Sequence, residues 1–205
     1  MQRIAIHPTH PQTRLAATAA RLIEADGLAI LPTDASYVLA CSLESRSAVE
    51  RLRAIRRVDE RHLLTLVCRD LSELSVYAQV DNRQFRFLKE WTPGAYVFIL
   101  PATREVPRRL WHPSRKTLGL RVPGNPAMHA LLEAFGRPLI ASSLVMPGEA
   151  DPLCDADEIV RRLGKLVDVF VESDAPCIEP TTIIDLTGGD AVVVREGRGP
   201  VDRLR

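Results

Sequence analysis

Segments of two hydrophobic periods alternate along this chain, and this alternation limits the possible folds more than any other feature. Apolar residues at helical spacing predict helices over residues 13–26, 47–57, 70–79, 82–91, 126–135 and 156–163. Short apolar runs between proline, glycine or polar residues predict strands over residues 3–7, 28–31, 37–42, 63–68, 95–100, 117–122, 139–145, 167–172, 182–186 and 191–195. Strands dominate the C-terminal fifth. The order predicts an α/β fold with a mixed sheet.

The length and composition favour one globular domain. The chain has 205 residues, of which 46% are hydrophobic and 26% charged, and this excludes a disordered or fibrous protein. A chain of this length can bury a sizeable core. No linker divides it, so we expect one domain over residues 13–200. An N-terminal strand and turn over residues 1–12 precede it, and a tail over residues 200–205, loose from Gly199 on, follows it.

Charge, hydropathy and cysteine spacing narrow the class of protein further. The formal net charge of +1 excludes a globally basic nucleic-acid binder, although a local basic patch remains open. No apolar run approaches the roughly 20 residues of a membrane helix, and residues 1–10 lack a signal-peptide pattern, so we expect a cytoplasmic protein. The cysteines form no CxxC pair and are predicted to be buried free thiols rather than zinc ligands. They are Cys41, Cys68, Cys154 and Cys177.

Polar side chains recur where the predicted strands end, and open α/β sheets bind ligands at such ends. The dinucleotide-binding glycine pattern, the P-loop, HExxH and GxSxG are all absent. Each strand-end group has a plain structural alternative, such as a turn, a cap or an arginine that faces solvent. Together, however, the arginines and hydroxyls predict a site for an anionic ligand. The groups are Thr33, Asp34, Arg121, Ser142, Ser143, Thr181, Thr182 and Arg195.

A basic cluster surrounds the end of the predicted helix over residues 47–57. Cations near a helix C-terminus are ordinary, because they interact favourably with the helix dipole and the last carbonyls. The functional alternative is a set of guanidinium groups that bind phosphate. Both interpretations stay open. The cluster consists of Arg51, Arg53, Arg56, Arg57 and Arg61.

Five short motifs, in this order, resemble those of the YrdC-like family. They are Pro32-Thr33-Asp34 with Tyr37, Arg121-Val122-Pro123, Ser142-Ser143, Pro180-Thr181-Thr182-Ile183-Ile184-Asp185 and Val194-Arg195-Glu196-Gly197. The resemblance covers roughly residues 13–200, and stretches such as residues 66–74 and 98–101 look closest to the YciO branch. It implies a twisted mixed parallel/antiparallel sheet flanked by helices (YrdC/RibB-like), with a large electropositive cavity.

The resemblance also implies an activity. It is L-threonylcarbamoyl-AMP synthesis from ATP, threonine and bicarbonate with release of pyrophosphate, a nucleotidyl transfer that supplies the t6A modification of tRNA. Mg²⁺ is expected on the triphosphate. Such a reaction requires positioning and neutralisation of phosphate charge more than a covalent nucleophile. Some family members are also described as binding double-stranded RNA, so a tRNA or double-stranded RNA partner is a further expectation.

Site roles carry over where this sequence matches the family's motifs. Arg56 stands at the family's phosphate-binding lysine, and the residues implied to contact the nucleotide are Arg56, Thr117, Ser143 and Arg195. No covalent catalytic residue is implied, since Arg56 and Arg195 would act by neutralising charge. Arg121 would bind the threonine carboxylate. The residues implied to contact the amino-acid substrate are Thr33, Tyr37, Arg121, Ser142 and Thr181.

Three departures from the family's pattern leave a second function open. Ala35 replaces a threonine, Val58 replaces a basic residue, and Val145 replaces an asparagine. An apolar valine cannot form the hydrogen bonds of an amide, and each lost contact costs about 1–3 kcal/mol. The losses could abolish threonine adenylation or redirect the site. The alternative is therefore a non-catalytic module that binds double-stranded RNA or a nucleotide, with salt-dependent contacts to phosphates.

Overall fold

The computed structural model describes residues 1–177 and 179–204, and its strands form one 10-stranded sheet in the order β1-β8-β2-β3-β7-β4-β6-β5-β9-β10. The strands are β1 (Gln2–Ala5), β2 (Ala29–Leu31), β3 (Val38–Ser42), β4 (Thr65–Val67), β5 (Tyr96–Pro101), β6 (Thr117–Arg121), β7 (Leu139–Ser143), β8 (Val169–Glu172), β9 (Thr182–Asp185) and β10 (Val192–Arg195). The pairs β1–β8, β2–β8, β4–β6 and β5–β9 are parallel, and the other pairs are antiparallel. The predicted α/β fold with a mixed sheet is confirmed.

Helices fill most of the connections, and their ends follow local sequence signals. They are α1 (Thr13–Glu24), α2 (Arg46–Arg56), α3 (Leu71–Tyr77), α4 (Asn82–Trp91), α5 (Pro126–Phe135) and α6 (Ala156–Leu163), with short 3₁₀ turns η1 (Arg108–Leu110) and η2 (Asp202–Leu204). The Asp70 and Asp81 side chains cap α3 and α4, because their carboxylates accept backbone N–H groups of the first turns. No helix among the described residues has the length and apolar character to cross a membrane.

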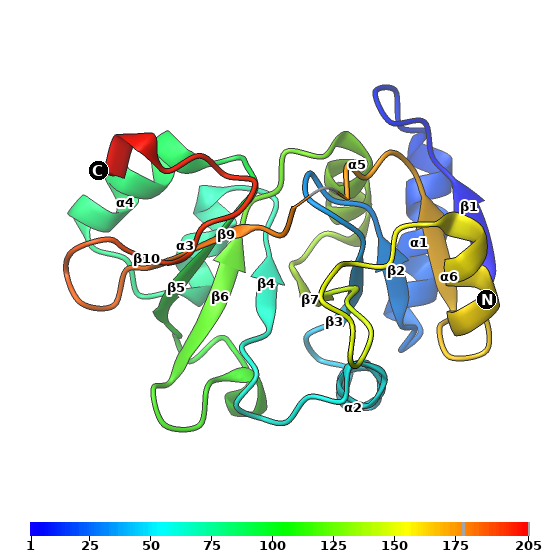
Figure 1. Ribbon diagram of the computed structural model, residues 1–205, viewed down its shortest axis with the longest axis horizontal. Helices are drawn as coiled ribbons and strands as arrows, with labels where there is room; N and C mark the ends of the chain where they lie inside the picture. Colours follow the sequence, from blue (N-terminus) through cyan, green and yellow to red (C-terminus); the bar gives the residue numbers. More distant parts are fainter. Residues whose placement is uncertain (178, 205) are drawn as a thin grey trace.

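The helices cover both faces of the sheet. Successive residues of a strand point in opposite directions, so they pack in two different cores. In β2, Ile30 packs in a core with α2, α3, α4 and α6, whereas Ala29 and Leu31 pack in a second core with α1 and α5. Figure 1 shows α6 and β1 at one end of the molecule and α4 and β10 at the other. The second core ends near β7 and β4, so α1 and α5 cover only part of their face.

The predicted loose tail was wrong for the residues that follow Gly199. The Thr182 hydroxyl donates to the Gly199 carbonyl at 2.6 Å, and the Tyr96 hydroxyl donates to the Pro200 carbonyl at 2.9 Å. Val201 is buried, and η2 follows it. Buried hydroxyls need partners, and the backbone of this segment supplies them. Of the predicted tail, Arg205 lies outside the described residues.

The prediction of four free thiols was wrong for two cysteines. Cys41 and Cys68 are buried and free, as expected. Cys154 and Cys177 form a disulfide with their Cα atoms 6.0 Å apart. This disulfide joins the loop after β7 to the segment after β8. The pairing depends on how distant strands are ordered in the sheet, and cysteine spacing alone carries no such information.

Candidate functional site

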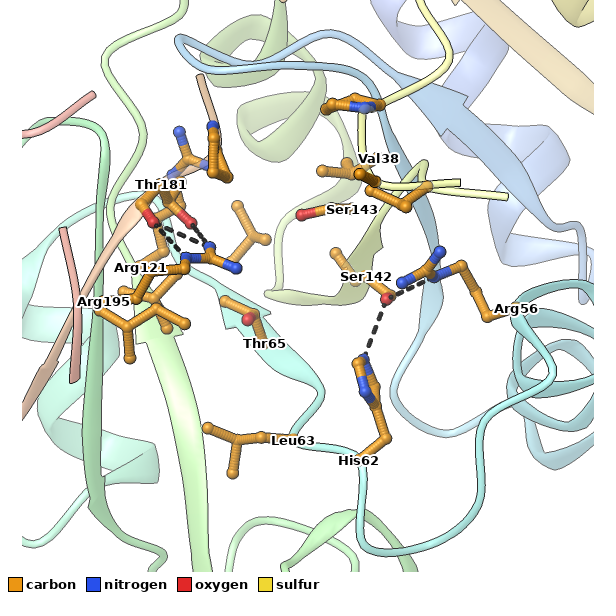
Figure 2. A pocket seen from close by; sticks show the side chains of 18 residues that line it. Val38, Arg56, His62, Leu63, Thr65, Arg121, Ser142, Ser143, Thr181 and Arg195 are labelled. Atoms are coloured by element: carbon orange, nitrogen blue, oxygen red, sulfur yellow. Dashed lines mark hydrogen bonds between the residues drawn. The ribbon is translucent and has the colours of Figure 1, made fainter. Parts of the chain in front are cut away.

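A cavity of about 420 Å³ lies on the part of the sheet face that α1 and α5 leave open. Its floor consists of side chains from strands β3, β4, β5, β6, β7 and β9, among them Val38, Thr65, Arg121 and Ser143 (Figure 2). The 18 lining residues are Val38, Arg56, His62, Leu63, Thr65, Val67, Val97, Arg121, Ala141, Ser142, Ser143, Val145, Ala150, Pro152, Pro180, Thr181, Ile183 and Arg195. The residues predicted from separate strand ends therefore converge in large part on one cavity.

Arg121 lies at the end of β6 and is almost fully buried at the cavity wall. One of its terminal nitrogens donates to the Asp34 carboxylate, whose other oxygen accepts the Gly124 N–H at 2.9 Å. Burial lowers the pKa of Arg121, and Asp34 opposes that shift. The Nε atom of Arg121 is buried and has no hydrogen-bond partner in the described part of the chain. A buried donor without a partner is costly, so this atom favours an acceptor from a ligand.

Arg195, the last residue of β10, is held on the same side of the cavity as Arg121 (Figure 2). Its guanidinium donates to the Thr181 carbonyl from Nη2 at 2.8 Å and from Nε at 3.1 Å. Its Nη2 atom also lies 3.2 Å from the Thr181 hydroxyl. Partial burial lowers the pKa of Arg195. No carboxylate pairs with Arg195 within the described residues, so its charge is available to an anion.

Arg56, His62 and Ser142 meet on the opposite side of the cavity, and we call them the Ser142 cluster (Figure 2). Arg56, the last residue of α2, donates from Nε to the Ser142 hydroxyl at 3.2 Å. The His62 Nε2 atom lies 3.3 Å from the same hydroxyl. Burial lowers the pKa of Arg56, and burial together with Arg56 and Arg53 lowers the pKa of His62. The imidazole is therefore neutral at pH 7 beside a charged guanidinium.

The charge of the cavity lining has one sign. Three guanidinium groups and one imidazole line it, and the described lining residues include no Asp or Glu. Asp34 reaches Arg121 but is itself outside the lining. Fixed positive charges without acidic partners favour a bound anion, and arginine suits phosphate and carboxylate groups because its donors are planar and paired.

Of the residues that the resemblance assigns to substrate contacts, three do not reach this cavity. The Thr33 hydroxyl donates to the Ser36 carbonyl at 2.7 Å and accepts backbone N–H groups, so it shapes the turn after β2. Tyr37 points to the other face, stacks edge-on against Phe170 and donates to the Ser173 carbonyl at 2.6 Å. Thr117 lies at the start of β6, four residues before Arg121, with a buried hydroxyl that has no partner among the described residues.

The basic cluster near α2 divides into one cavity residue and several structural ones. Arg56 alone of the cluster lines the cavity. Arg51 pairs with Asp168 at 2.8 Å, Arg53 donates to the Arg109 carbonyl at 3.3 Å, and Arg57 is a left-handed cap at the end of α2. An ion pair, a hydrogen bond to a backbone carbonyl and a helix cap therefore account for Arg51, Arg53 and Arg57, in that order.

Sequence reasoning missed His62 and, apart from Val145, the lining loop that follows β7. His62 lies in an irregular segment between α2 and β4, where no periodic pattern marks a functional residue. Its position just before a strand was the available signal. Val145, Ala150 and Pro152 belong to the loop that the disulfide ties to the segment before Pro180. Of the three departures from the family's pattern, only Val145 lines the cavity.

Comparisons with known proteins agree with this architecture. The chain matches the Sua5/YciO/YrdC family, described by the phrase "Telomere recombination", over residues 21–197. It is 49% identical to the uncharacterized protein YciO of Escherichia coli over 96% of this chain and 95% of that protein. It is 46% identical to an uncharacterized protein of Haemophilus influenzae over 95% of this chain and 94% of that protein.

Two solved structures show the same fold. The crystal structure of E. coli YciO superposes with a TM-score of 0.95 at 48% identity, over 100% of this chain and 99% of that one. P. abyssi Sua5 complexed with L-threonine superposes with a TM-score of 0.90 at 22% identity, over 100% of this chain and 60% of that one. At 22% identity, the second comparison establishes the fold alone.

Proposed function

Since this chain belongs to the Sua5/YciO/YrdC family, we propose that it is an ATP-dependent, L-threonylcarbamoyl-AMP synthase-like nucleotidyltransferase linked to t6A modification of tRNA. Its substrates would be ATP, threonine and bicarbonate, and its products threonylcarbamoyl-AMP and pyrophosphate. One observation carries the proposal. Arg56, Arg121 and Arg195 come from distant segments, yet they line one cavity whose described lining contains no acid.

The lining residues suit two parts of the reaction. Arg56, Arg195 and Ser143 would neutralise and orient the phosphates, while Arg121, Ser142 and Thr181 would hold the amino-acid substrate. The Nε atom of Arg121 supports this role because it is a buried donor without a protein partner. The fold shared with a Sua5 protein that binds L-threonine also supports it.

Phosphate charge is the main obstacle to such a transfer. The carbamate oxygen attacks the α-phosphorus, and pyrophosphate leaves, so negative charge shifts onto the leaving group. Preorganised donors stabilise that charge in a site shielded from water. The described lining offers Mg²⁺ no carboxylate, so we propose that the ion arrives with ATP and is held by the phosphates and water.

The test is incubation of the purified protein with ATP, Mg²⁺, threonine and labelled bicarbonate, followed by detection of labelled threonylcarbamoyl-AMP and pyrophosphate. We expect product only when threonine is present. Arg56→Met should lower the rate, because it removes a phosphate-facing charge but keeps the buried methylenes. Arg61→Met is the matched control, since Arg61 is exposed and outside the cavity. Equal rates for both variants would contradict the role of Arg56.

The second candidate function is the non-catalytic module, and Val145 favours it. A valine in the cavity lining cannot supply the hydrogen bonds of the family's asparagine. A folded protein that binds ATP or RNA but forms no product would support this module. RNA affinity that falls steeply with salt would indicate contacts to the phosphate backbone.

A further inference from the structure

The Ser142 cluster contains a proton acceptor in a cavity whose other polar lining side chains are permanent cations and hydroxyls. Arginine stays protonated, and serine and threonine hydroxyls do not act as bases near neutral pH. No Asp, Glu, Lys, Cys or Tyr occurs among the described lining residues. Asp34 lies nearby but is engaged by Arg121 and the Gly124 N–H. His62 is thus the lining group that can exchange a proton at physiological pH.

The hydrogen bonds of the cluster suit His62 to accept a proton. Arg56 can only donate, so its Nε–H group occupies one lone pair of the Ser142 hydroxyl. The hydroxyl hydrogen is then free to point at His62 Nε2, which lies 3.3 Å away. In this arrangement the neutral ring carries its hydrogen on Nδ1, and Nε2 is the nitrogen that can accept a proton.

The electrostatic surroundings keep the ring unprotonated. Burial has the largest effect on the His62 pKa, and Arg56 and Arg53 on α2 lower it further. Asp59, in the loop before His62, acts in the opposite direction but does not reverse the shift. A base that is already neutral at pH 7 is ready to accept a proton from a substrate.

The proposed reaction releases one proton that the cavity must remove. A protonated amine and bicarbonate give a carbamate, one water and one proton, as a C–N bond forms and a C–O bond of bicarbonate breaks. The later attack of the carbamate on the α-phosphorus transfers no proton. Only the first of these two steps therefore needs a base.

We propose that His62 is the base that accepts this proton, directly or through the Ser142 hydroxyl, when the substrate amine becomes a carbamate in the cavity. The inference rests on the proposed function. It assigns His62 to carbamate formation and leaves adenylyl transfer to the arginines.

The two steps can be measured separately. His62→Gln keeps a hydrogen-bonding group beside Ser142 but cannot accept a proton, and His10→Gln, an exposed site, is the matched control. With threonine, bicarbonate and ATP, we expect His62→Gln to form product about 100-fold more slowly than the unaltered protein. With threonylcarbamoyl-AMP and pyrophosphate supplied, the reverse formation of ATP should be unchanged.

Further readouts separate a base from a structural residue. The rate of the unaltered protein should fall as the pH drops through the pKa of His62, and His62→Gln should lack this acidic limb. Added imidazole should restore part of the rate of His62→Ala. Equal losses in the forward and reverse reactions would overturn the proposal and make His62 a positioning residue. An unimpaired His62→Gln would also overturn it, while absence of product with the unaltered protein would overturn the proposed function itself.

Discussion

The same face of the sheet is closed over one half and open over the other. In the closed half, α1 and α5 pack on β1, β2, β3, β7 and β8 through residues such as Ile23 and Leu131, which are fully buried. In the open half, the strands carry Thr65, Arg121 and other cavity residues. Arg56 is the only cavity residue that any described helix contributes.

The difference shows how a helical layer with a gap becomes a binding site. Apolar side chains in the closed half stabilise the fold by leaving water. In the open half a buried guanidinium occupies an equivalent position on the sheet, which costs free energy unless a partner compensates it. Gly119 leaves room for the side chains of the cavity floor, because a Cβ atom there would lie 2.9 Å from Val97 Cγ1 and 3.0 Å from Thr65 Oγ1. The open half therefore lacks the apolar packing of the closed half and has a cavity that can bind an anion.

The largest expected effect comes from breaking the ion pair at the wall of the open half. Asp34→Ala should lower the free energy of unfolding by about 3–5 kcal/mol, because it leaves the Arg121 guanidinium buried without its counter-charge. Urea denaturation measures this change. Added phosphate or sulfate should restore part of the lost stability by binding near Arg121.

A surface ion pair provides the control for Asp34→Ala. Glu44 pairs with Arg137 at 2.8 Å, but the Glu44 side chain is 65% exposed, so Glu44→Ala should cost less than about 1 kcal/mol. Similar losses for the two variants would show that breaking the Arg121–Asp34 pair costs no more stability than breaking an exposed pair. Solvent would then reach Arg121 freely, and the contrast between the two halves would fail.

A smaller effect compares apolar residues in the two halves directly. Leu131→Ala in the closed half should cost about 3 kcal/mol, because it removes buried carbons and leaves a void under α5. Val97→Ala in the open half should cost about 1.5 kcal/mol, the transfer value of two methyl groups, since it only enlarges an existing cavity. Thermal or urea unfolding of both variants measures the difference, and a larger loss for Val97→Ala would reverse the assignment of the two halves.

Much of the fold was predictable because its determinants are local. Hydrophobic period identified the helices and strands, and capping residues such as Asp70 and Asp81 marked where helices begin. The strand order was beyond such reasoning, since it depends on packing between distant segments. The bond between Cys154 and Cys177 and the burial of Val201 follow from that order, and both contradicted the sequence-based expectation.

The site was predictable to the extent that its residues lie at strand ends. Arg121, Ser143 and Arg195 end β6, β7 and β10, and all three reach the cavity. Thr117 begins β6 instead, so the length of the strand separates it from the cavity. His62 was missed because an irregular segment positions it, and the reason for its placement is visible only with Ser142 beside it.

The smallest effect on stability should accompany a large effect on binding. Arg195→Met should change the free energy of unfolding by less than about 1 kcal/mol, because Arg195 lies on an edge strand and its hydrogen bonds to Thr181 are only partly buried. It should weaken ATP or pyrophosphate binding by roughly 10-fold to 100-fold, the loss expected for one charge-assisted hydrogen bond. Calorimetric titration measures the affinity, with Arg83→Met, an exposed arginine paired with Asp190 near β10, as the control. Unchanged affinity would remove Arg195 from the site. A marked loss of stability would mean that the hydrogen bonds of Arg195 to Thr181 hold β10 in place. One of the charges in the open half would then have a structural role.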